Sequence, residues 1–420
     1  MFVSTIREKG GKPVLLTPVA RRWFTDEGVF KENSHTDYPS AMKAVAQEMD
    51  VPLLDITTRT EDWIRSAGDM ATRPYFMHLE KGKYASHPQG LVDNTHTNAR
   101  GARKVTEIVC EEIAKTLPEI ASHLVHYDLV VSTDGHGDYM SVQDAVNAAP
   151  DYLHGTITTI YIRKGTYREM VTIPHNKFRV HLIGEDADST LIIWDKSANK
   201  MWPDRDSLKI GTSGSASMYI HSSYVTLENL TVENPMRDSD GEGQAVAIFI
   251  GGDHIFFNHC RFIGWQDTMY TYGYYNKTGG PCRLYAKDCY IEGTTDFIFG
   301  PMTCLFEDCH IHCKKDSYIT AASTLPEWKY GYVFKNCRIT AADDVKSVYL
   351  GRPWRPYAKT VFINCELGSF IHPAGWKSWP RKDKPFGDGS DTAFYAERGN
   401  RGKGAATKNR VGWSHQLTKK

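Results

Sequence analysis

The sequence predicts an all-β parallel β-helix over its C-terminal part, preceded by a shorter α/β region. Two observations support the β-helix: a short motif recurs every 20 to 30 residues after residue 228, and no helical pattern separates its copies. A third observation is the change near residue 126, where alternating helix and strand patterns give way to short β-branched and aromatic runs. We therefore expect two regions, residues 1–125 and residues 126–420.

The first region has the pattern of alternating strands and helices. Apolar periodicity predicts strands at Lys12–Pro18 and Val51–Ile56, a helix at Pro39–Met49 and a long helix at Asn98–Leu117. The apolar patch Val14–Ala20 runs directly into two arginines without a small-residue cleavage site, so we interpret it as a buried strand and not as a signal peptide. The second region starts with one predicted helix, Ser141–Ala149, which ends before Pro150.

The repeated motif centres on a cysteine in five copies and on a leucine in an earlier one. The copies are Glu228-Asn-Leu-Thr-Val, Asn258-His-Cys-Arg-Phe, Lys287-Asp-Cys-Tyr-Ile, Glu307-Asp-Cys-His-Ile, Lys335-Asn-Cys-Arg-Ile and Ile363-Asn-Cys-Glu-Leu. Their central positions are 30, 29, 20, 28 and 28 residues apart, which predicts one strand per copy and one coil per repeat.

The nine cysteines show no zinc-binding spacing, and their odd number does not fit a disulfide framework. We expect the repeated ones to stack as free thiols inside the solenoid. Disulfides between coils are the alternative, because neighbouring strands lie only ~4.8 Å apart.

Charge and hydropathy exclude two classes of protein. Lys plus Arg and Asp plus Glu both number 50, so the chain lacks the basic footprint of a nucleic-acid-binding protein. The apolar run Ala245–Ile250 is far shorter than the ~20 residues of a membrane span. We expect neither a nucleic-acid partner nor a membrane span.

A second column of polar residues follows the same repeat. Asp267 and Asp296 each lie seven residues after a repeat cysteine and 29 residues apart, so the register that stacks the cysteines also stacks the two aspartates. The same alignment places Gln244 one coil before Gln266, and Arg352 lies within reach of an aspartate. Crowded carboxylates acquire different pKa values, and amide groups can donate to an oxyanion. The pattern therefore predicts an acid–base site.

Strict strand alternation would send Gln266 and Asp267 to opposite faces of the sheet. We therefore expect the backbone to bend at this point.

Four segments, in order, resemble the signature segments of the pectin methylesterase family: Gly243-Gln-Ala-Val-Ala, Gly264-Trp-Gln-Asp-Thr-Met-Tyr, Gly293-Thr-Thr-Asp-Phe-Ile-Phe-Gly and Leu350-Gly-Arg-Pro-Trp. The resemblance covers residues 128–415 and implies a right-handed parallel β-helix. It implies Asp296 as nucleophile, Asp267 as general acid and then base, and Gln244 and Gln266 as oxyanion donors. The implied mechanism needs no metal or cofactor.

The same resemblance implies that Arg352 orients Asp296 and keeps it ionised, while Trp354 and Phe297 line the sugar groove. It implies a pectic polysaccharide partner and an extracellular or periplasmic location. Two departures from the family pattern, a longer loop at Tyr272–Cys282 and Pro301 after Gly300, lead us to expect a reshaped groove.

The segment from Val92 to Ala102 resembles the last block of SGNH hydrolases of the rhamnogalacturonan acetylesterase type. The resemblance implies that Asp93 and His96 are remnants of a Ser-His-Asp triad, so residues 1–125 would be a partial SGNH-hydrolase-like segment. The Gly-Asp-Ser segment that carries the nucleophile is missing, and we predict no acetylesterase activity. A truncated gene model and a partner segment that supplies the missing half are the two explanations.

Three functions remain open from the residues alone. The first is an esterase that removes methyl esters from pectin. The second is a β-helical glycosidase or lyase that acts on the pectin backbone, since two neighbouring aspartates also suit a glycosidase. The third is a carbohydrate-binding solenoid without chemistry. The paired glutamines favour the esterase.

Overall fold

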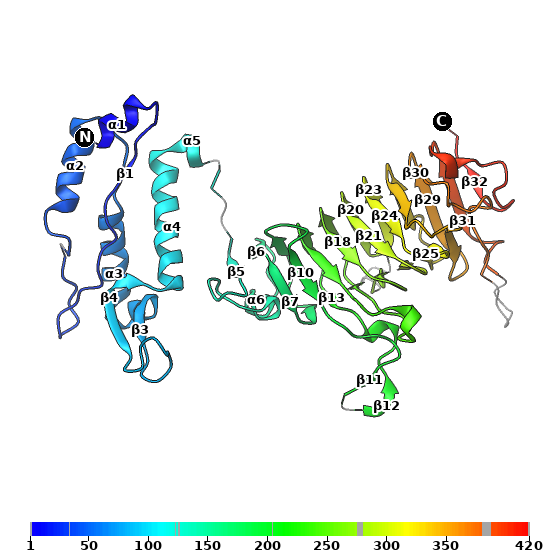
Figure 1. Ribbon diagram of the computed structural model, residues 1–420, viewed down its shortest axis with the longest axis horizontal. Helices are drawn as coiled ribbons and strands as arrows, with labels where there is room; N and C mark the ends of the chain where they lie inside the picture. The colour runs from blue at the N-terminus through cyan, green and yellow to red at the C-terminus, as the bar shows by residue number, and fades with distance from the viewer. Residues whose placement is uncertain are drawn as a thin grey trace. The chain divides into compact units, whose positions relative to one another are not determined.

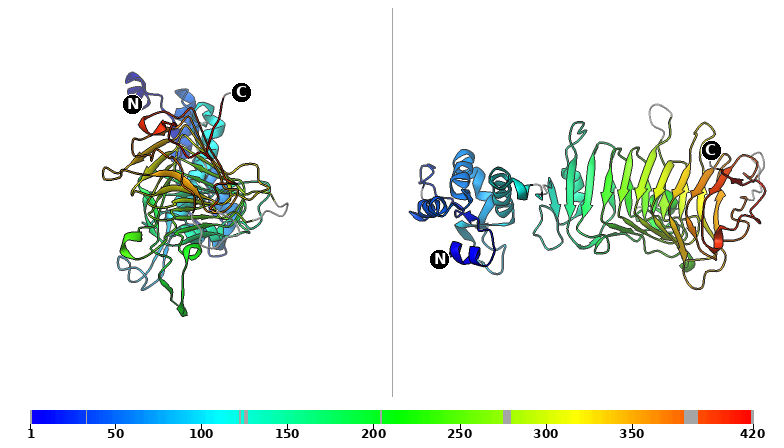
Figure 2. Two further views of the ribbon diagram at one scale, coloured as in Figure 1. Left: turned by 90° about the vertical axis from the view of Figure 1, so that its right-hand side faces the viewer. Right: turned by 90° about the horizontal axis from the view of Figure 1, so that it is seen from above.

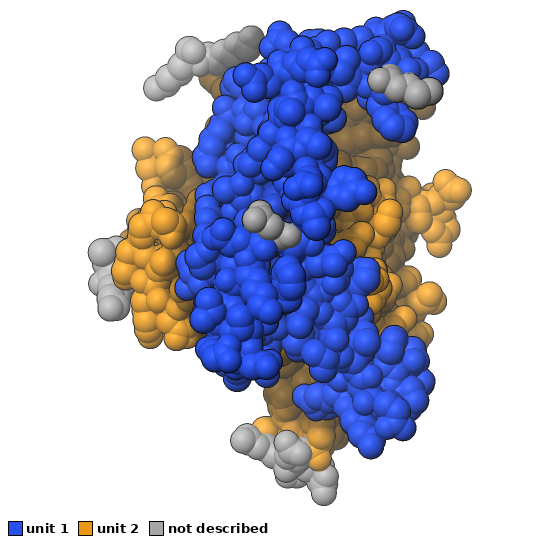
Figure 3. Space-filling model, turned by 90° about the vertical axis from the view of Figure 1, so that its left-hand side faces the viewer, with its two compact units in different colours: residues 1–126 blue, residues 127–420 orange. Residues whose placement is uncertain are grey.

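The computed structural model describes residues 2–32, 34–121, 123–124, 127–203, 205–274, 280–379 and 388–418. The chain divides into two compact units, residues 1–126 and residues 127–420, which Figure 3 colours separately. No helix in these described ranges is both long and apolar enough to cross a membrane.

The first unit contains helices and two small sheets. Its elements are α1 (Phe2–Glu8), β1 (Leu15–Leu16), α2 (Tyr38–Glu48), β2 (Leu53–Leu54), α3 (Ile56–Thr72), the 3₁₀ helix η1 (Arg73–Tyr75), β3 (Phe76–Leu79), β4 (Leu91–Thr97), α4 (Ala99–Thr116) and α5 (Pro118–Ala121). β1 and β2 pair in parallel, whereas β3 and β4 pair antiparallel. Leu54 packs with Val109 and Ile113, so the apolar face of α4 covers the β1–β2 pair.

The two helices predicted in this unit are confirmed as α2 and α4, and the Asn98 side chain caps α4 by accepting from the Gly101 N–H at 3.1 Å. The predicted strands shrink to two residues each. Leu16 is 45% exposed, so the interpretation of residues 14–20 as a buried strand is wrong. The sequence patterns missed α3, in which Gly68 breaks the helical backbone with φ +83°.

The second unit is a parallel β-helix of three sheets, whose strands stack coil after coil along its length (Figures 1 and 2). The first sheet comprises β5 (Leu129–Val131), β6 (Thr158–Ile162), β9 (Val180–Gly184), β14 (Thr226–Glu228), β17 (Ile255–Asn258), β20 (Arg283–Lys287), β23 (Thr303–Glu307), β26 (Tyr332–Lys335), β29 (Lys359–Ile363), β31 (Phe394–Arg398) and β32 (His415–Gln416). The second comprises β7 (Gly165–Arg168), β10 (Thr190–Ile193), β15 (Thr231–Glu233), β18 (Arg261–Ile263), β21 (Tyr290–Gly293), β24 (His310–Cys313), β27 (Arg338–Ala341) and β30 (Glu366–Leu367). The third comprises β8 (Val171–Ile173), β13 (Met218–Ile220), β16 (Ile248–Ile250), β19 (Met269–Tyr270), β22 (Ile298–Gly300), β25 (Tyr318–Ala322) and β28 (Tyr349–Pro353). The predicted parallel β-helix is confirmed.

Shorter elements complete this unit. They are α6 (Val142–Ala148), the hairpin β11 (Met201–Trp202) and β12 (Arg205–Lys209), and the 3₁₀ helices η2 (Thr212–Gly214), η3 (Asp238–Asp240) and η4 (Lys403–Ala405). The predicted helix at 141–149 is confirmed as α6, and its buried face joins the solenoid core at the first coils. The Ser141 hydroxyl accepts from the Asp144 N–H at 3.1 Å and so caps this helix.

The repeated motif marks a corner of the coil and not the middle of a strand. β17 ends at Asn258 and β18 begins at Arg261, so Cys260 lies between the first and second sheets. The residue before each central position has a left-handed backbone with φ between +50° and +56°, at Asn229, His259, Asp288, Asp308, Asn336 and Asn364. Asn and Asp are among the few residues that tolerate this conformation, which explains why they recur there.

Apolar side chains fill the interior in columns. The rings of Phe306, Phe334 and Phe362 stack with centroids 4.6 and 4.4 Å apart. All nine cysteines are free, and eight of them are buried. The Cys337 thiol donates to the carbonyl of Phe306 on the preceding coil at 3.3 Å, and the Cys365 thiol donates in the same way to Phe334 at 3.5 Å. The thiols therefore serve as small apolar fillers that also bond to the neighbouring coil.

The left-handed backbone at the corner can be tested by substitution of Asn336, whose side chain is exposed. We expect Asn336→Val to lower the free energy of unfolding by about 1–2 kcal/mol, because a β-branched residue resists the left-handed backbone. Asn336→Gly is the control and should leave stability nearly unchanged, as measured by urea denaturation. Equal losses in both variants would contradict the backbone explanation.

Candidate active site

The two aspartates that the sequence aligned lie side by side on successive coils. The Asp267 N–H donates to the Thr295 carbonyl at 3.1 Å, which brings Asp267 next to Asp296. Both residues have a left-handed backbone, with φ +69° and +51°. This is the bend that strand alternation required, since it lets Gln266 and Asp267 face the same groove.

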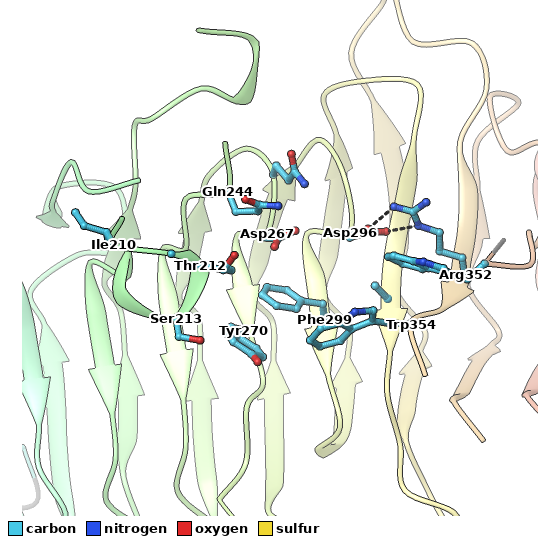
Figure 4. Close-up of a pocket in the computed structure, with 14 residues that line it drawn as sticks. Ile210, Thr212, Ser213, Gln244, Asp267, Tyr270, Asp296, Phe299, Arg352 and Trp354 are labelled. Atoms are coloured by element: carbon cyan, nitrogen blue, oxygen red, sulfur yellow. Dashed lines mark hydrogen bonds and ion pairs between the residues drawn. The ribbon is translucent and has the colours of Figure 1, made fainter. Parts of the chain in front are cut away.

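The two glutamines follow the same register. The Ala245 N–H donates to the Gln266 carbonyl at 3.2 Å, so Gln244 lies one coil before Gln266. Both glutamines and both aspartates line one groove with a volume of about 530 Å³. In Figure 4, Asp267 lies between Gln244 and Asp296.

Arg352 binds Asp296 from the opposite side. It belongs to β28, and its Nε and Nη2 atoms donate to Oδ1 and Oδ2 of Asp296 at 3.0 and 2.6 Å (Figure 4). Its guanidinium carbon lies 3.9 Å from the ring centre of Tyr318 and 3.8 Å from that of Trp379. Two aromatic faces and a bidentate ion pair therefore hold the guanidinium in one orientation.

These contacts make the two carboxyls electrostatically different. Asp267 is 9% exposed, and burial together with the nearby charge of Asp296 raises its pKa well above the usual range. Burial also raises the pKa of Asp296, but hydrogen bonds and positive charge from Arg352 oppose that rise. Within the described residues, Asp267 has no ion pair of its own. Arg352 therefore favours the ionised form of Asp296 over that of Asp267.

An aromatic column runs along the third sheet, and its members Tyr270 and Phe299 form the floor of the groove. Tyr219, Phe249, Tyr270 and Phe299 occupy equivalent positions on successive strands of the third sheet, and Trp354 packs against this column. Aromatic faces suit the apolar faces of sugar rings, so the floor fits a polysaccharide chain. Across the described residues, no three His, Cys, Asp or Glu side chains converge to hold a metal ion.

The structure brings Trp354 to the groove but corrects the expectation for Phe297. Phe297 is fully buried and packs, like Ile298, in the interior of the solenoid. The bend at Asp296 turns two consecutive residues inward, so Phe299 and not Phe297 reaches the groove. Tyr270 and Phe299 each lie ten residues after a repeat cysteine, and this shared offset is the signal that identifies Phe299.

In the first unit, Asp93 and His96 form a hydrogen-bonded pair on β4. Nδ1 of His96 lies 2.6 Å from Oδ2 of Asp93, whose other oxygen accepts the N–H groups of Thr95 and His96. These hydrogen bonds lower the pKa of Asp93 to about 2. The His96 side chain is largely exposed, and no described hydroxyl or thiol is hydrogen-bonded to it.

Comparison with known proteins places this site in a family. The family model described as pectinesterase matches residues 128–420. The chain belongs to the pectinesterase family. Pectinesterase 31 of Arabidopsis thaliana is 38% identical over 291 residues, which make up 68% of this chain and 86% of that relative.

Solved structures agree with this assignment. The pectin methylesterase from carrot superposes with a TM-score of 0.62 at 32% identity, over 70% of this chain and 90% of that one. A pectin methylesterase in complex with a hexasaccharide superposes with a TM-score of 0.60 at 31% identity, over 70% and 94%. The pectinesterase unit is thus an enzyme that removes methyl esters from pectin, and the esterase prediction is confirmed over the glycosidase, lyase and non-catalytic alternatives.

The Arg352–Asp296 pair predicts a pH-dependent effect on stability. Because burial raises the pKa of Asp296 in the folded chain, ionisation of this group costs stability as the pH rises, and Arg352 reduces that cost. Arg352→Gln should therefore be only slightly destabilising at low pH, where Asp296 is protonated, and destabilising by about 3 kcal/mol near neutral pH.

Denaturation at several pH values measures this difference. Arg401→Gln is a matched control, because its pair with Glu366 is exposed at 3.6 Å and should contribute at most about 1 kcal/mol. A loss for Arg352→Gln that does not change with pH would contradict the assigned charge on Asp296.

Proposed function

We propose that the pectinesterase unit hydrolyses the C6 methyl ester of galacturonate units through an acyl-enzyme on Asp296. The observation that carries this proposal is the asymmetric pair: two adjacent buried carboxyls, of which only Asp296 is bound by Arg352. An ionised, positioned carboxylate suits a nucleophile, and a neighbouring carboxyl that keeps its proton suits a general acid.

In the first step, a carboxylate oxygen of Asp296 attacks the ester carbonyl carbon and forms a tetrahedral intermediate. The side-chain amides of Gln244 and Gln266, which line the same groove, donate hydrogen bonds to the developing oxyanion. The bond to the methoxy group then breaks, and Asp267 transfers its proton to the departing oxygen, which leaves as methanol.

In the second step, Asp267 is a carboxylate and acts as a base. It accepts a proton from a water molecule, whose oxygen attacks the acyl carbon of the anhydride with Asp296. The free galacturonate carboxyl leaves, Asp296 regains its carboxylate, and Asp267 regains its proton. The cycle consumes one water for each methanol released and uses only side chains that line the groove.

The substrate assignment rests on the shape and chemistry of the groove. Its aromatic floor of Tyr270 and Phe299, with Trp354 on one side, suits a chain of pyranose rings, as does the hexasaccharide bound by a similar pectin methylesterase. Because pectic polymers are found outside the cytoplasm, we infer that the enzyme acts in an extracellular or periplasmic compartment.

We expect Asp296→Asn to lower kcat for methanol release from methylated pectin by at least ~10³-fold, since the amide is not a nucleophile. Asp267→Asn should cause a loss of similar order by removing the acid and base. Asp253→Asn is the control, because Asp253 pairs with Arg283 at 2.7 Å and does not line the groove. Substantial methanol release by Asp296→Asn would overturn the nucleophile assignment.

We infer that Asp93 and His96 are an SGNH-hydrolase-like remnant without acetylesterase activity. Their geometry supports an oriented imidazole, but a triad also requires a serine within hydrogen-bonding reach.

Acetate release from acetylated rhamnogalacturonan tests this inference on the full chain. We expect no acetate above the level of a His96→Ala variant. Release by the unaltered chain that His96→Ala abolishes would show a working site.

A further inference from the structure

Tyr318, the first residue of β25, contacts both members of the Arg352–Asp296 pair. Its carbonyl accepts from the Asp296 N–H at 2.9 Å, and this bond between coils holds the left-handed backbone of Asp296. Its ring faces the Arg352 guanidinium, with 3.9 Å between the guanidinium carbon and the ring centre. One residue therefore supports both the backbone of the aspartate and the side chain of the arginine that binds it.

The Tyr318 side chain does not form part of the groove wall. Trp379, which faces the same guanidinium at 3.8 Å, lines the catalytic groove, whereas Tyr318 is not among the described residues that line it. Tyr318 is also absent from the described lining of a cavity of about 270 Å³ that includes Tyr272 and Pro301. Of the longer loop that starts at Tyr272, residues 275–279 lie outside the described residues. The Tyr318 ring therefore acts on a bound substrate through the arginine and not by direct contact.

A short aromatic column holds the Tyr318 ring in place. The ring of Tyr349, its register partner on β28, stacks on it with centres 5.5 Å apart and planes 23° apart. His372 stacks in turn on Tyr349, with centres 4.4 Å apart. Stacked rings of this kind attract one another and restrict side-chain rotation. The surface that faces Arg352 is thus in place before a substrate binds.

The orientation of the guanidinium sets the orientation of the Asp296 carboxylate. Nε and Nη2 of Arg352 donate to the two carboxylate oxygens at 3.0 and 2.6 Å, so a rotation of this fork turns the carboxylate with it. Attack on a carbonyl carbon needs the oxygen close to the carbon and correctly aligned, and small misplacements of a reacting group are costly. A ring that fixes the guanidinium plane therefore influences the rate of the attack.

We propose that Tyr318 is a positioning residue, whose ring fixes the guanidinium plane of Arg352 and so aims the Asp296 carboxylate at the ester carbon. This inference rests on the proposed function, because it concerns the orientation of the proposed nucleophile. Loss of the ring lowers the rate of the chemical step and leaves substrate binding nearly unchanged, since the residues that line the groove are all retained.

Kinetics of methanol release from methylated pectin test the proposal. Tyr318→Leu removes the ring but keeps the backbone hydrogen bond to Asp296, so we expect kcat to fall about tenfold with KM within about twofold of its original value. Tyr318→Phe keeps the ring and should keep kcat within about twofold. In an Arg352→Gln background, Tyr318→Leu should lower kcat no further, because its effect passes through the guanidinium.

Tyr349→Leu is the matched control, because it removes a half-buried ring from the same column. The described cation–ring contacts join both tyrosines to Lys377, at 5.8 and 5.5 Å, but only Tyr318 to Arg352. The control should therefore keep kcat within about twofold. Thermal unfolding of each variant checks that it folds. If Tyr318→Leu does not fold, Tyr318→Val, whose branched side chain suits a strand, takes its place.

An unchanged kcat in Tyr318→Leu, an equal fall in Tyr349→Leu or in Tyr318→Phe, or a further fall in the Arg352→Gln background overturns the proposal. A rise in KM with kcat unchanged also overturns it, because that result would assign the ring to substrate binding. Substantial methanol release by Asp296→Asn would instead contradict the proposed function.

Discussion

Parallel backbone hydrogen bonds join each coil of residues 127–420 to the next, and the position of every groove side chain depends on them. Neighbouring strands lie ~4.8 Å apart, so residues in register on two coils are forced into contact. In the interior this register stacks phenylalanine rings and thiols, which stabilise the solenoid by burial. On the outer face it brings Asp267 against Asp296, an arrangement that a purely structural sheet would avoid because like charges repel.

The repulsion between Asp267 and Asp296 is reduced because the two carboxyls have different partners. Arg352 binds one carboxylate with two hydrogen bonds and is itself packed between the rings of Tyr318 and Trp379. The other carboxyl is buried without a cation of its own among the described residues, and burial together with the charge of Asp296 raises its pKa. The same contacts that make the pair tolerable in the fold also make the two carboxyls electrostatically different, as the proposed roles of nucleophile and acid require.

The left-handed residues connect the fold to the site. At the corners between the first two sheets, Asn, Asp and His adopt positive φ and turn the chain. At the start of the third sheet, Asp267 and Asp296 adopt the same conformation, and there the turned residues line the groove. Strain of this kind is maintained by the hydrogen bonds between coils on either side, and it aims the two carboxyls at the groove.

Much of the architecture could be predicted from the sequence, because coil length and register are properties of a one-dimensional repeat. The spacing of the cysteines was enough to align Asp267 with Asp296, and Asn98 and Ser141 marked the starts of two helices through their capping side chains. Other features depended on the tertiary structure. The motif proved to be a corner, Phe299 replaced Phe297 in the groove, and the short strands of the first unit did not extend as their apolar runs suggested. The sequence by itself determined which residues share a register, since register follows from spacing. Only the tertiary structure decided which face each side chain takes. The physical reason is that a single left-handed residue reverses the alternation of side chains between the two faces without changing the spacing of the repeat.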